Sequence, residues 1–144
     1  MQNPPPMSVE TGSGGEIKAK TALGLDANLG AALGYPVGIL AIVIFIMEKE
    51  NRFARFHALQ SILYHVAWVV VFIVLGIILG ILMVLLGLIS SSLAAIGSIL
   101  LFLGYLIAFL LYIGGLLFLA FKAYGGATMK LSVIGNMAEK ILNK

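Results

Sequence analysis

Apolar residues dominate this chain in long uninterrupted runs, and these runs predict membrane-spanning helices. From Phe56 to Phe121, sixty-six consecutive residues include no Lys, Arg, Asp or Glu. A helix that crosses a bilayer needs about 20 such residues, so this run suits two passes rather than one. Three consecutive serines at 90–92 provide a turn near its middle. We therefore expect spans at about residues 60–89 and 93–121.

A separate apolar segment precedes this run and predicts one more span. Residues 29–47 would rise about 28 Å as a helix, which is enough to cross the hydrocarbon. Asp26 is suited to cap the start of this helix, because its carboxylate can accept from free backbone N–H groups. Pro36 lies inside the segment and should kink the helix, since proline removes one backbone hydrogen bond.

The two ends of the chain differ from its apolar middle. Residues 1–22 contain three consecutive prolines and a Gly-Ser-Gly-Gly stretch, which predict a disordered N-terminal tail. Over about residues 131–143, apolar side chains recur at helical spacing between polar ones. This segment is too short and too polar to cross a membrane, so it predicts an amphipathic helix on the membrane surface. A helix that caps the bundle is the alternative.

These patterns predict an all-α integral membrane protein, with three transmembrane helices and a C-terminal amphipathic interfacial helix in one domain over residues 23–144. The composition agrees, because 61% of the residues are hydrophobic and only 10% are charged, against about 25% charged in globular proteins. The absence of Cys excludes disulfides and Cys-ligated metals. The net charge of +3 comes without a basic, aromatic-rich stripe, so we expect the lipid bilayer and no nucleic acid as a partner.

The distribution of positive charge predicts an orientation. Three spans would place the two termini on opposite sides of the membrane. Seven Lys and Arg residues then fall on the side of the first loop and the C-terminus, and two fall on the side of the N-terminus. The positive-inside rule predicts a multi-pass protein of the cell (plasma) membrane, with the first loop and the C-terminus in the cytoplasm and the N-terminal tail outside.

Small residues recur on the predicted spans at spacings that allow helix backbones to approach closely. Helices in lipid associate through such close packing and through hydrogen bonds, because burying apolar surface gains little there. The glycines expected at helix contacts are Gly30, Gly34, Gly38, Gly76, Gly80, Gly97 and Gly104. The sequence leaves open whether these faces pack within one chain or between chains.

Polar side chains gather at the start of the second predicted span. They are His57, Gln60, Ser61, Tyr64 and His65, followed by Trp68. Their spacings of three and four residues place them on one side of a helix. Polar groups entering a membrane are costly without partners, so this polar stripe should face the bundle interior or the interface. The simplest interpretation is a belt of hydrogen bonds. Two more specific interpretations are a solute pathway lined by these residues and a pigment bound by His65.

The same residues give little support to a metal site or to catalysis. His57 and His65 lie about 12 Å apart along a helix axis, too far to share one ion. Ser61 and His65 have the spacing of a nucleophile and its base, but the spans contain no carboxylate that could orient the histidine. We therefore expect no metal, no cofactor, no catalytic residue and no enzymatic activity.

One dense charge cluster follows the first predicted span, at residues 48–55. Its cations are Lys49, Arg52 and Arg55. Each cation close to an anionic lipid surface contributes about 1 kcal/mol of attraction. Exposed ion pairs within the cluster would contribute less. We expect these three side chains to contact lipid headgroups or a protein partner.

Residues 48–61, with the stretch Arg-Phe-His-Ala-Leu-Gln-Ser, resemble the signature of a widespread family of small bacterial and archaeal membrane proteins of unassigned function. That family is distantly similar to the chloroplast inner-envelope Tic protein-import component. Residues 24–28 and 122–126 resemble it too, and the similarity covers about residues 22–143. Ser132 stands where the family has proline. The resemblance implies a link to a protein-conducting pore, although the plant proteins have four spans and this sequence predicts three.

Three functions are consistent with these observations. The leading hypothesis is a non-enzymatic membrane protein that assembles with itself or within a larger membrane complex. The first alternative is a transport or translocation component, in which several copies surround a pathway lined by the polar stripe. The second alternative is an accessory subunit of an energy-converting complex, with His65 close to a pigment or quinone.

Overall fold

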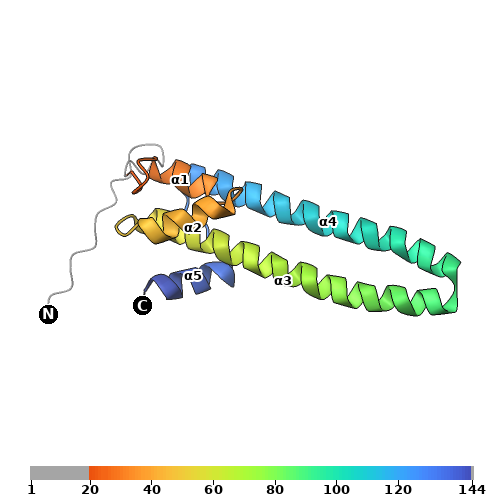
Figure 1. The fold of residues 1–144 in the computed structure, drawn as a ribbon. Coiled ribbons are helices and arrows are strands. Elements are labelled where there is room, and N and C mark those ends of the chain that lie inside the picture. The colour runs from red at the N-terminus through yellow and green to blue at the C-terminus, as the bar shows by residue number, and fades with distance from the viewer. Residues whose placement is uncertain (1–19, 144) are drawn as a thin grey trace.

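The structure is a computed structural model that describes residues 20–143, so most of the predicted tail at 1–22 lies outside the described residues. The described part is helical, apart from turns, loops and one isolated bridge between Lys20 and Asp26. Its helices are α1 (Ala27–Leu33), α2 (Gly38–Met47), α3 (Arg52–Ile89), α4 (Ser91–Tyr124) and α5 (Ile134–Leu142) (Figure 1).

Helices α3 and α4 form a long antiparallel hairpin. They contain 38 and 34 residues, or about 57 and 51 Å of rise. Both are long and apolar enough to cross a membrane, as the sequence predicts for this region. The chain reverses at Ser90, whose hydroxyl oxygen accepts from the Ser92 backbone N–H at 3.2 Å and so caps α4. We call this reversal the tip and the opposite end the base.

The predicted continuous helix over residues 29–47 is wrong. Helix α1 ends at Leu33 and the chain turns back, so α2 runs in the opposite direction (Figure 1). A Cβ added to Gly30 would lie 3.6 Å from Ile44, and one added to Gly34 would lie 3.5 Å from Ala41, which confirms the antiparallel pairing. Pro36 therefore marks a break rather than a kink. We call α1 and α2 the short hairpin; neither helix is long enough to cross a membrane.

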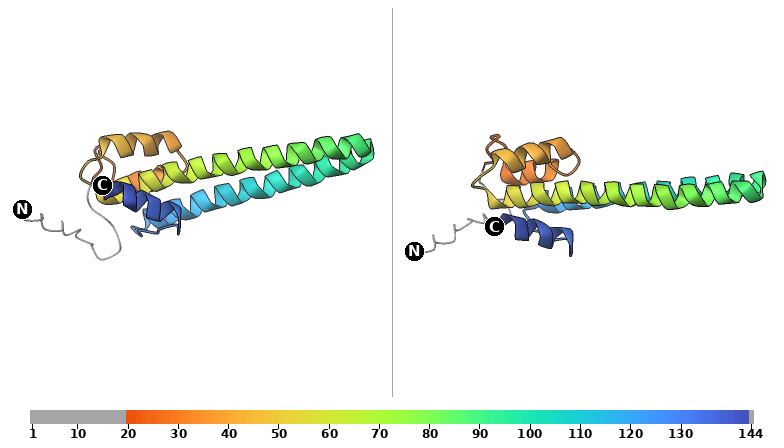
Figure 2. Two further views of the ribbon diagram at one scale, coloured as in Figure 1. Left: turned by 90° about the horizontal axis from the view of Figure 1, so that it is seen from below. Right: turned by 60° about the horizontal axis from the view of Figure 1, so that its bottom comes forward.

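The short hairpin packs on the base of the long hairpin, with α1 against both long helices and α2 against α3. Helix α1 lies against α4, where Ala31 and Ala32 share a buried cluster with Leu116, Leu119 and Ala123. Helix α2 lies against α3, through a second cluster that contains Ala41, Ile44, Ala54 and Ala58. The right view of Figure 2 shows α5 on the side of the long hairpin opposite the short hairpin.

Helix α5 packs on α3 as well as presenting an exposed face. Ala138 is fully buried in a cluster with Phe56 and Leu59 of α3. Met137 and Ile141 are about half exposed. The predicted amphipathic helix is present, with Ile134–Leu142 as its bounds, and its contact with α3 matches the alternative of a helix that caps the bundle.

The long hairpin beyond the base presents apolar side chains on its outer surface. Ile73, Ile77 and Leu88 of α3, and Phe102 and Leu110 of α4, are each more than half exposed. Soluble proteins rarely expose so large a continuous apolar surface to water, whereas such a surface is stable in contact with lipid tails. The apolar surface and the length of both helices therefore match a membrane environment.

Candidate functional site

The polar stripe of α3 lies inside the base, where α3 meets the short hairpin, α4 and the loop before α5. His57, Gln60 and Ser61 are buried almost completely, Tyr64 is buried, and His65 is half-buried. Helix α3 places them together because positions separated by three and four residues share a face. This face meets the short hairpin, the end of α4 and the loop before α5.

Tyr35, in the turn of the short hairpin, is the centre of this network. The Gln60 amide donates to the Tyr35 hydroxyl at 3.0 Å and to the Met129 backbone carbonyl at 3.0 Å. The Tyr35 hydroxyl lies 3.0 Å from Nδ1 of His57. The Tyr35 oxygen accepts from Gln60, and which of Tyr35 and His57 donates in their own contact depends on the tautomer of the imidazole. The three side chains thereby join the short hairpin, α3 and the α4–α5 loop.

The remaining polar-stripe residues bind backbone groups nearby. The Ser61 hydroxyl donates to the Gly34 carbonyl at 2.8 Å, which satisfies a backbone acceptor where α1 ends. The Tyr64 hydroxyl donates to the Tyr112 carbonyl of α4 at 3.0 Å, and the two rings stack at 5.9 Å. Nδ1 of His65 lies 2.8 Å from the Ser61 carbonyl, one turn earlier on the same helix. The polar stripe is thus a hydrogen-bonded belt within one chain.

A second polar cluster, which the sequence did not reveal, surrounds Glu48 in the loop between α2 and α3. Its carboxylate accepts from the backbone N–H groups of Ala22 at 2.7 Å, Asn51 at 3.0 Å and Glu50 at 3.1 Å. Burial raises the pKa of Glu48, but these backbone donors outweigh burial and hold the pKa below its ordinary value of 4.5. The resulting contribution to stability is present above pH 4.5 and is lost as the pH falls through the lowered pKa.

The Glu48 cluster fixes the relation between two chain segments. The N–H of Ala22 comes before the short hairpin, and the carboxylate follows it. Asn51, held by the same carboxylate, caps α3 by accepting from the Ala54 N–H at 3.1 Å. Both ends of the short hairpin therefore meet at the base, and the expected placement of the N-terminal side opposite the first loop does not fit this geometry.

The three cations of the first loop have different surroundings. Lys49 is exposed, and Arg52 is exposed and donates to the Asn143 side chain beyond α5. Arg55 is half-buried, with its guanidinium 5.6 Å from the centre of the Phe45 ring. Lys49 is therefore free to approach a lipid headgroup, whereas Arg52 and Arg55 also bind within the base.

The expected packing glycines divide into two groups. Added Cβ atoms at Gly30, Gly34, Gly38, Gly76 and Gly97 would each lie within 3.6 Å of another side chain or of backbone, so these glycines line close contacts inside the molecule. Gly76 and Gly97 are close positions in the seam between α3 and α4, because their added Cβ atoms would each lie 2.9 Å from a side chain of the other helix. Gly80 and Gly104 have nothing within 4 Å of an added Cβ.

Sequence reasoning found the α3 half of the network and missed its partners. Tyr35 is fully buried, and a signal for it existed, because a hydroxyl inside an apolar segment needs a partner. The Met129 carbonyl carried no such signal, since any backbone carbonyl could serve. Within residues 20–143, no group of three or more His, Cys, Asp or Glu side chains is arranged to hold a metal ion.

Comparison with known proteins places the chain in a family. It is 39% identical over 122 residues to a UPF0132 membrane protein of Methanocaldococcus jannaschii, which covers 84% of this chain and 93% of that relative. The chain belongs to the UPF0132 family of membrane proteins. A UPF0132 membrane protein of Archaeoglobus fulgidus is 32% identical over 117 residues, covering 81% of this chain and 95% of the relative.

A second Methanocaldococcus jannaschii UPF0132 protein is 30% identical over 120 residues, covering 83% of this chain and 72% of the relative. No protein-family model matches the chain, and no solved structure is significantly similar to it. Membership in this family agrees with the expectation of a membrane family that occurs in archaea and with the two apolar helices that could span a membrane. None of the three names mentions protein import, so the resemblance to the Tic component stays a prediction.

Proposed function

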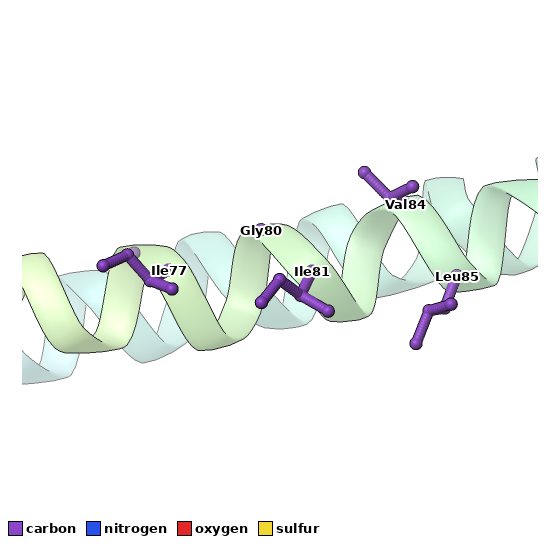
Figure 3. A pocket seen from close by; sticks show the side chains of 6 residues that line it. Ile77, Gly80, Ile81, Val84 and Leu85 are labelled. Atoms are coloured by element: carbon purple, nitrogen blue, oxygen red, sulfur yellow. The ribbon is translucent and has the colours of Figure 1, made fainter.

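We propose that this UPF0132 protein is a non-enzymatic component of membrane assemblies, which binds a second copy or another membrane subunit through a groove on α3. The groove has a volume of about 410 Å³ and is lined by Gly76, Ile77, Gly80, Ile81, Val84 and Leu85. Figure 3 shows side chains of Ile77, Ile81, Val84 and Leu85 along α3 around Gly80, which has none. This outward apolar groove is the observation that carries the proposal.

Among residues 20–143, no close contact explains the glycine at position 80. A glycine inside a helix costs about 1 kcal/mol relative to alanine. Close contact with another helix offsets that cost in membrane proteins, yet Gly80 has no neighbour within 4 Å of an added Cβ. A helix of another polypeptide could approach α3 at this position, with Ile77 and Val84 on either side of it.

The polar stripe supports assembly rather than transport. A transport pathway would need polar side chains that face a channel. His57, Gln60 and Ser61 instead bind Tyr35, Met129 and Gly34 within one chain. No contact of these residues favours a solute pathway, a pigment or a quinone, so the proposed function rests on the outer surface of the long hairpin.

The proposed orientation places the base in the cytoplasm of the cell. All seven Lys and Arg residues between 20 and 143 belong to segments at the base, and the tip around Ser90 has none. The positive-inside rule favours cytoplasmic placement of such an end. In this arrangement α3 and α4 cross the plasma membrane, and the short hairpin takes the place of the third span.

Native mass spectrometry of the full chain, released from its own membranes in lipid nanodiscs, tests the proposal. The unmodified protein is expected to appear as a dimer, as a higher oligomer or with a second subunit. Gly80→Leu adds a side chain to the groove at a position where an added Cβ has nothing within 4 Å, so it should shift the population to bare monomer without lowering the melting temperature.

Gly104→Leu is the matched control, because Gly104 also has no neighbour within 4 Å of an added Cβ and lies on α4. This variant should retain the assemblies of the unmodified chain. The proposed function is wrong if the unmodified chain is a bare monomer, or if Gly80→Leu assembles as the unmodified chain does.

A further inference from the structure

The short hairpin has charged groups only beyond its two ends, and these ends meet at the base. Residues 27–47 contain no Lys, Arg, Asp or Glu, whereas Asp26 precedes them and Glu48 follows them. The hydrogen bond from Ala22 N–H to Glu48 joins the flanking segments at 2.7 Å. The charge-free segment therefore leaves the base and returns to it.

The outer face of α2 is strongly apolar and has no partner among the described residues. Ile39 is 77% exposed and Ile46 is 60% exposed, with Ile42 between them at 46%. Spacings of three and four residues place these isoleucines on one face. Val37 in the turn is also about half exposed. A helix of a water-soluble protein would bury such a face.

This apolar face is continuous with the outer surface of α3. A Cβ added to Gly38 would lie 3.5 Å from His65, so the start of α2 meets α3 at that level. Immediately beyond it, Val66, Val69 and Val70 of α3 are each more than half exposed. Since α3 crosses the membrane in the proposed orientation, the medium around these valines is also next to Ile39.

Several backbone groups in the turn of the short hairpin are satisfied by hydrogen bonds within the protein. Backbone groups outside regular helix are tolerated in hydrocarbon only where protein satisfies them. The Gly34 N–H donates to Gly30 at 3.1 Å, the Gly34 carbonyl accepts from Ser61 at 2.8 Å, and the Val37 N–H donates to Leu33 at 3.1 Å. Pro36 has no N–H that needs an acceptor.

The dimensions of the short hairpin match one leaflet. Helix α2 has 10 residues, which rise about 15 Å, or roughly half of the 30 Å hydrocarbon core. We propose that the short hairpin is a re-entrant element that enters the bilayer from the base side, turns near Pro36 within the hydrocarbon and leaves on the same side. Its outer partner is the acyl chains of that leaflet, which contact Ile39, Ile42 and Ile46.

Spin labels on single cysteines measure this insertion directly, because the chain contains no Cys of its own. The variants Ile39→Cys and Ile46→Cys carry the label on exposed positions of α2, and Leu29→Cys carries it near the start of α1. Lys49→Cys serves as the aqueous reference, and Ile78→Cys, at a position of α3 that is 57% exposed, serves as the lipid reference. Each full-length variant is reconstituted in liposomes, and collisions with oxygen and with a water-soluble nickel chelate are compared.

The ratio of oxygen to nickel collisions at Ile39→Cys should match the lipid reference and exceed the ratios at Ile46→Cys and Leu29→Cys. That order means that the turn is the deepest part of the hairpin and that both ends are shallow on one side. Frequent nickel collisions at Ile39→Cys would overturn the proposal, because they would show that α2 lies in water. The level at which α3 enters the hydrocarbon would then be nearer Trp68.

Two further results would also overturn it. Rare collisions with both reagents at Ile39→Cys would mean that protein, such as a second copy, covers α2. If the nickel chelate reached the label at Leu29→Cys only from the side of the membrane opposite Lys49→Cys, residues 29–47 would cross the membrane completely. If the protein were monomeric but the label at Ile39→Cys lay in the hydrocarbon, only the proposed assembly function would be contradicted. The re-entrant hairpin and the assembly function can therefore be tested independently.

Discussion

At the scale of single residues, one buried hydroxyl joins the turn of the short hairpin to α3. Tyr35 is fully buried, accepts a hydrogen bond from Gln60 and lies 3.0 Å from Nδ1 of His57. Leaving a buried donor or acceptor unsatisfied costs about 1–3 kcal/mol. The network is therefore a stabilising feature of the base, and it holds the turn of the short hairpin against α3.

Tyr35→Phe should lower the free energy of unfolding by about 2 kcal/mol, because it leaves the Gln60 amide and the His57 imidazole each without one partner. Unfolding in mixed detergent micelles, followed by circular dichroism, measures the change. Tyr124→Phe is the control, since Tyr124 is 60% exposed and should tolerate the loss of its hydroxyl. Equal stability of the two variants would contradict the network.

The sequence predicted one half of this network for a physical reason. Gln60 and Ser61 follow His57 by three and four residues in a single helix, and helical geometry alone places them on one side of it. Their partners come from residues 35 and 129, on segments whose positions depend on the turn of the short hairpin and on the loop before α5. No local pattern encodes those positions.

At the scale of the helices, the largest difference between expectation and structure is the reversal at residues 34–37. Hydropathy over residues 29–47 is the same whether the segment crosses the membrane or returns, so the pattern alone cannot distinguish the two. The contacts of Gly30 with Ile44, and the hydrogen bond from Ser61 to the Gly34 carbonyl, fix the reversal. These contacts depend on the tertiary structure, whereas the long helices α3 and α4 follow from the apolar run itself.

Helix α5 depends on one close approach to α3. A Cβ added to Gly135 would lie 2.8 Å from Oε1 of Gln60 and 2.9 Å from the Lys130 Cα. The backbone of Lys130 cannot move without changing the loop that also presents the Met129 carbonyl to Gln60. Position 135 therefore requires glycine because a larger side chain would clash with its neighbours, and not because of an unusual backbone conformation.

Gly135→Ala should reduce the free energy of unfolding by about 1–3 kcal/mol, as overpacked positions do, and should loosen α5 from α3. Hydrogen exchange in detergent, read at the peptides of α5, measures the loosening, and a thermal melt measures the stability. Gly104→Ala has free space around its Cβ and should leave both readouts unchanged. Unchanged exchange in α5 of the Gly135 variant would contradict the tight contact.

At the scale of the whole molecule, the chain separates into a polar base and an apolar long hairpin. The base combines the short hairpin, α5 and the charged loops, while the rest of α3 and α4 contact mainly each other and present apolar side chains outward (Figure 1). This division accounts for the charge distribution, because every Lys and Arg between residues 20 and 143 belongs to the base end. It also leaves the groove at Gly80 on the membrane-embedded surface, where another helix can reach it.

The most direct test of this account is the sidedness of three single cysteines, introduced by Ala22→Cys, Ser91→Cys and Lys140→Cys. Each variant is expressed in prokaryotic cells. A membrane-impermeant maleimide is then applied to intact spheroplasts and to permeabilised ones. The account predicts that the Ser91 variant reacts in intact spheroplasts and that the Ala22 and Lys140 variants react only after permeabilisation. Reaction of the Ala22 and Lys140 variants from opposite sides, or of the Ser91 and Lys140 variants from the same side, would contradict it.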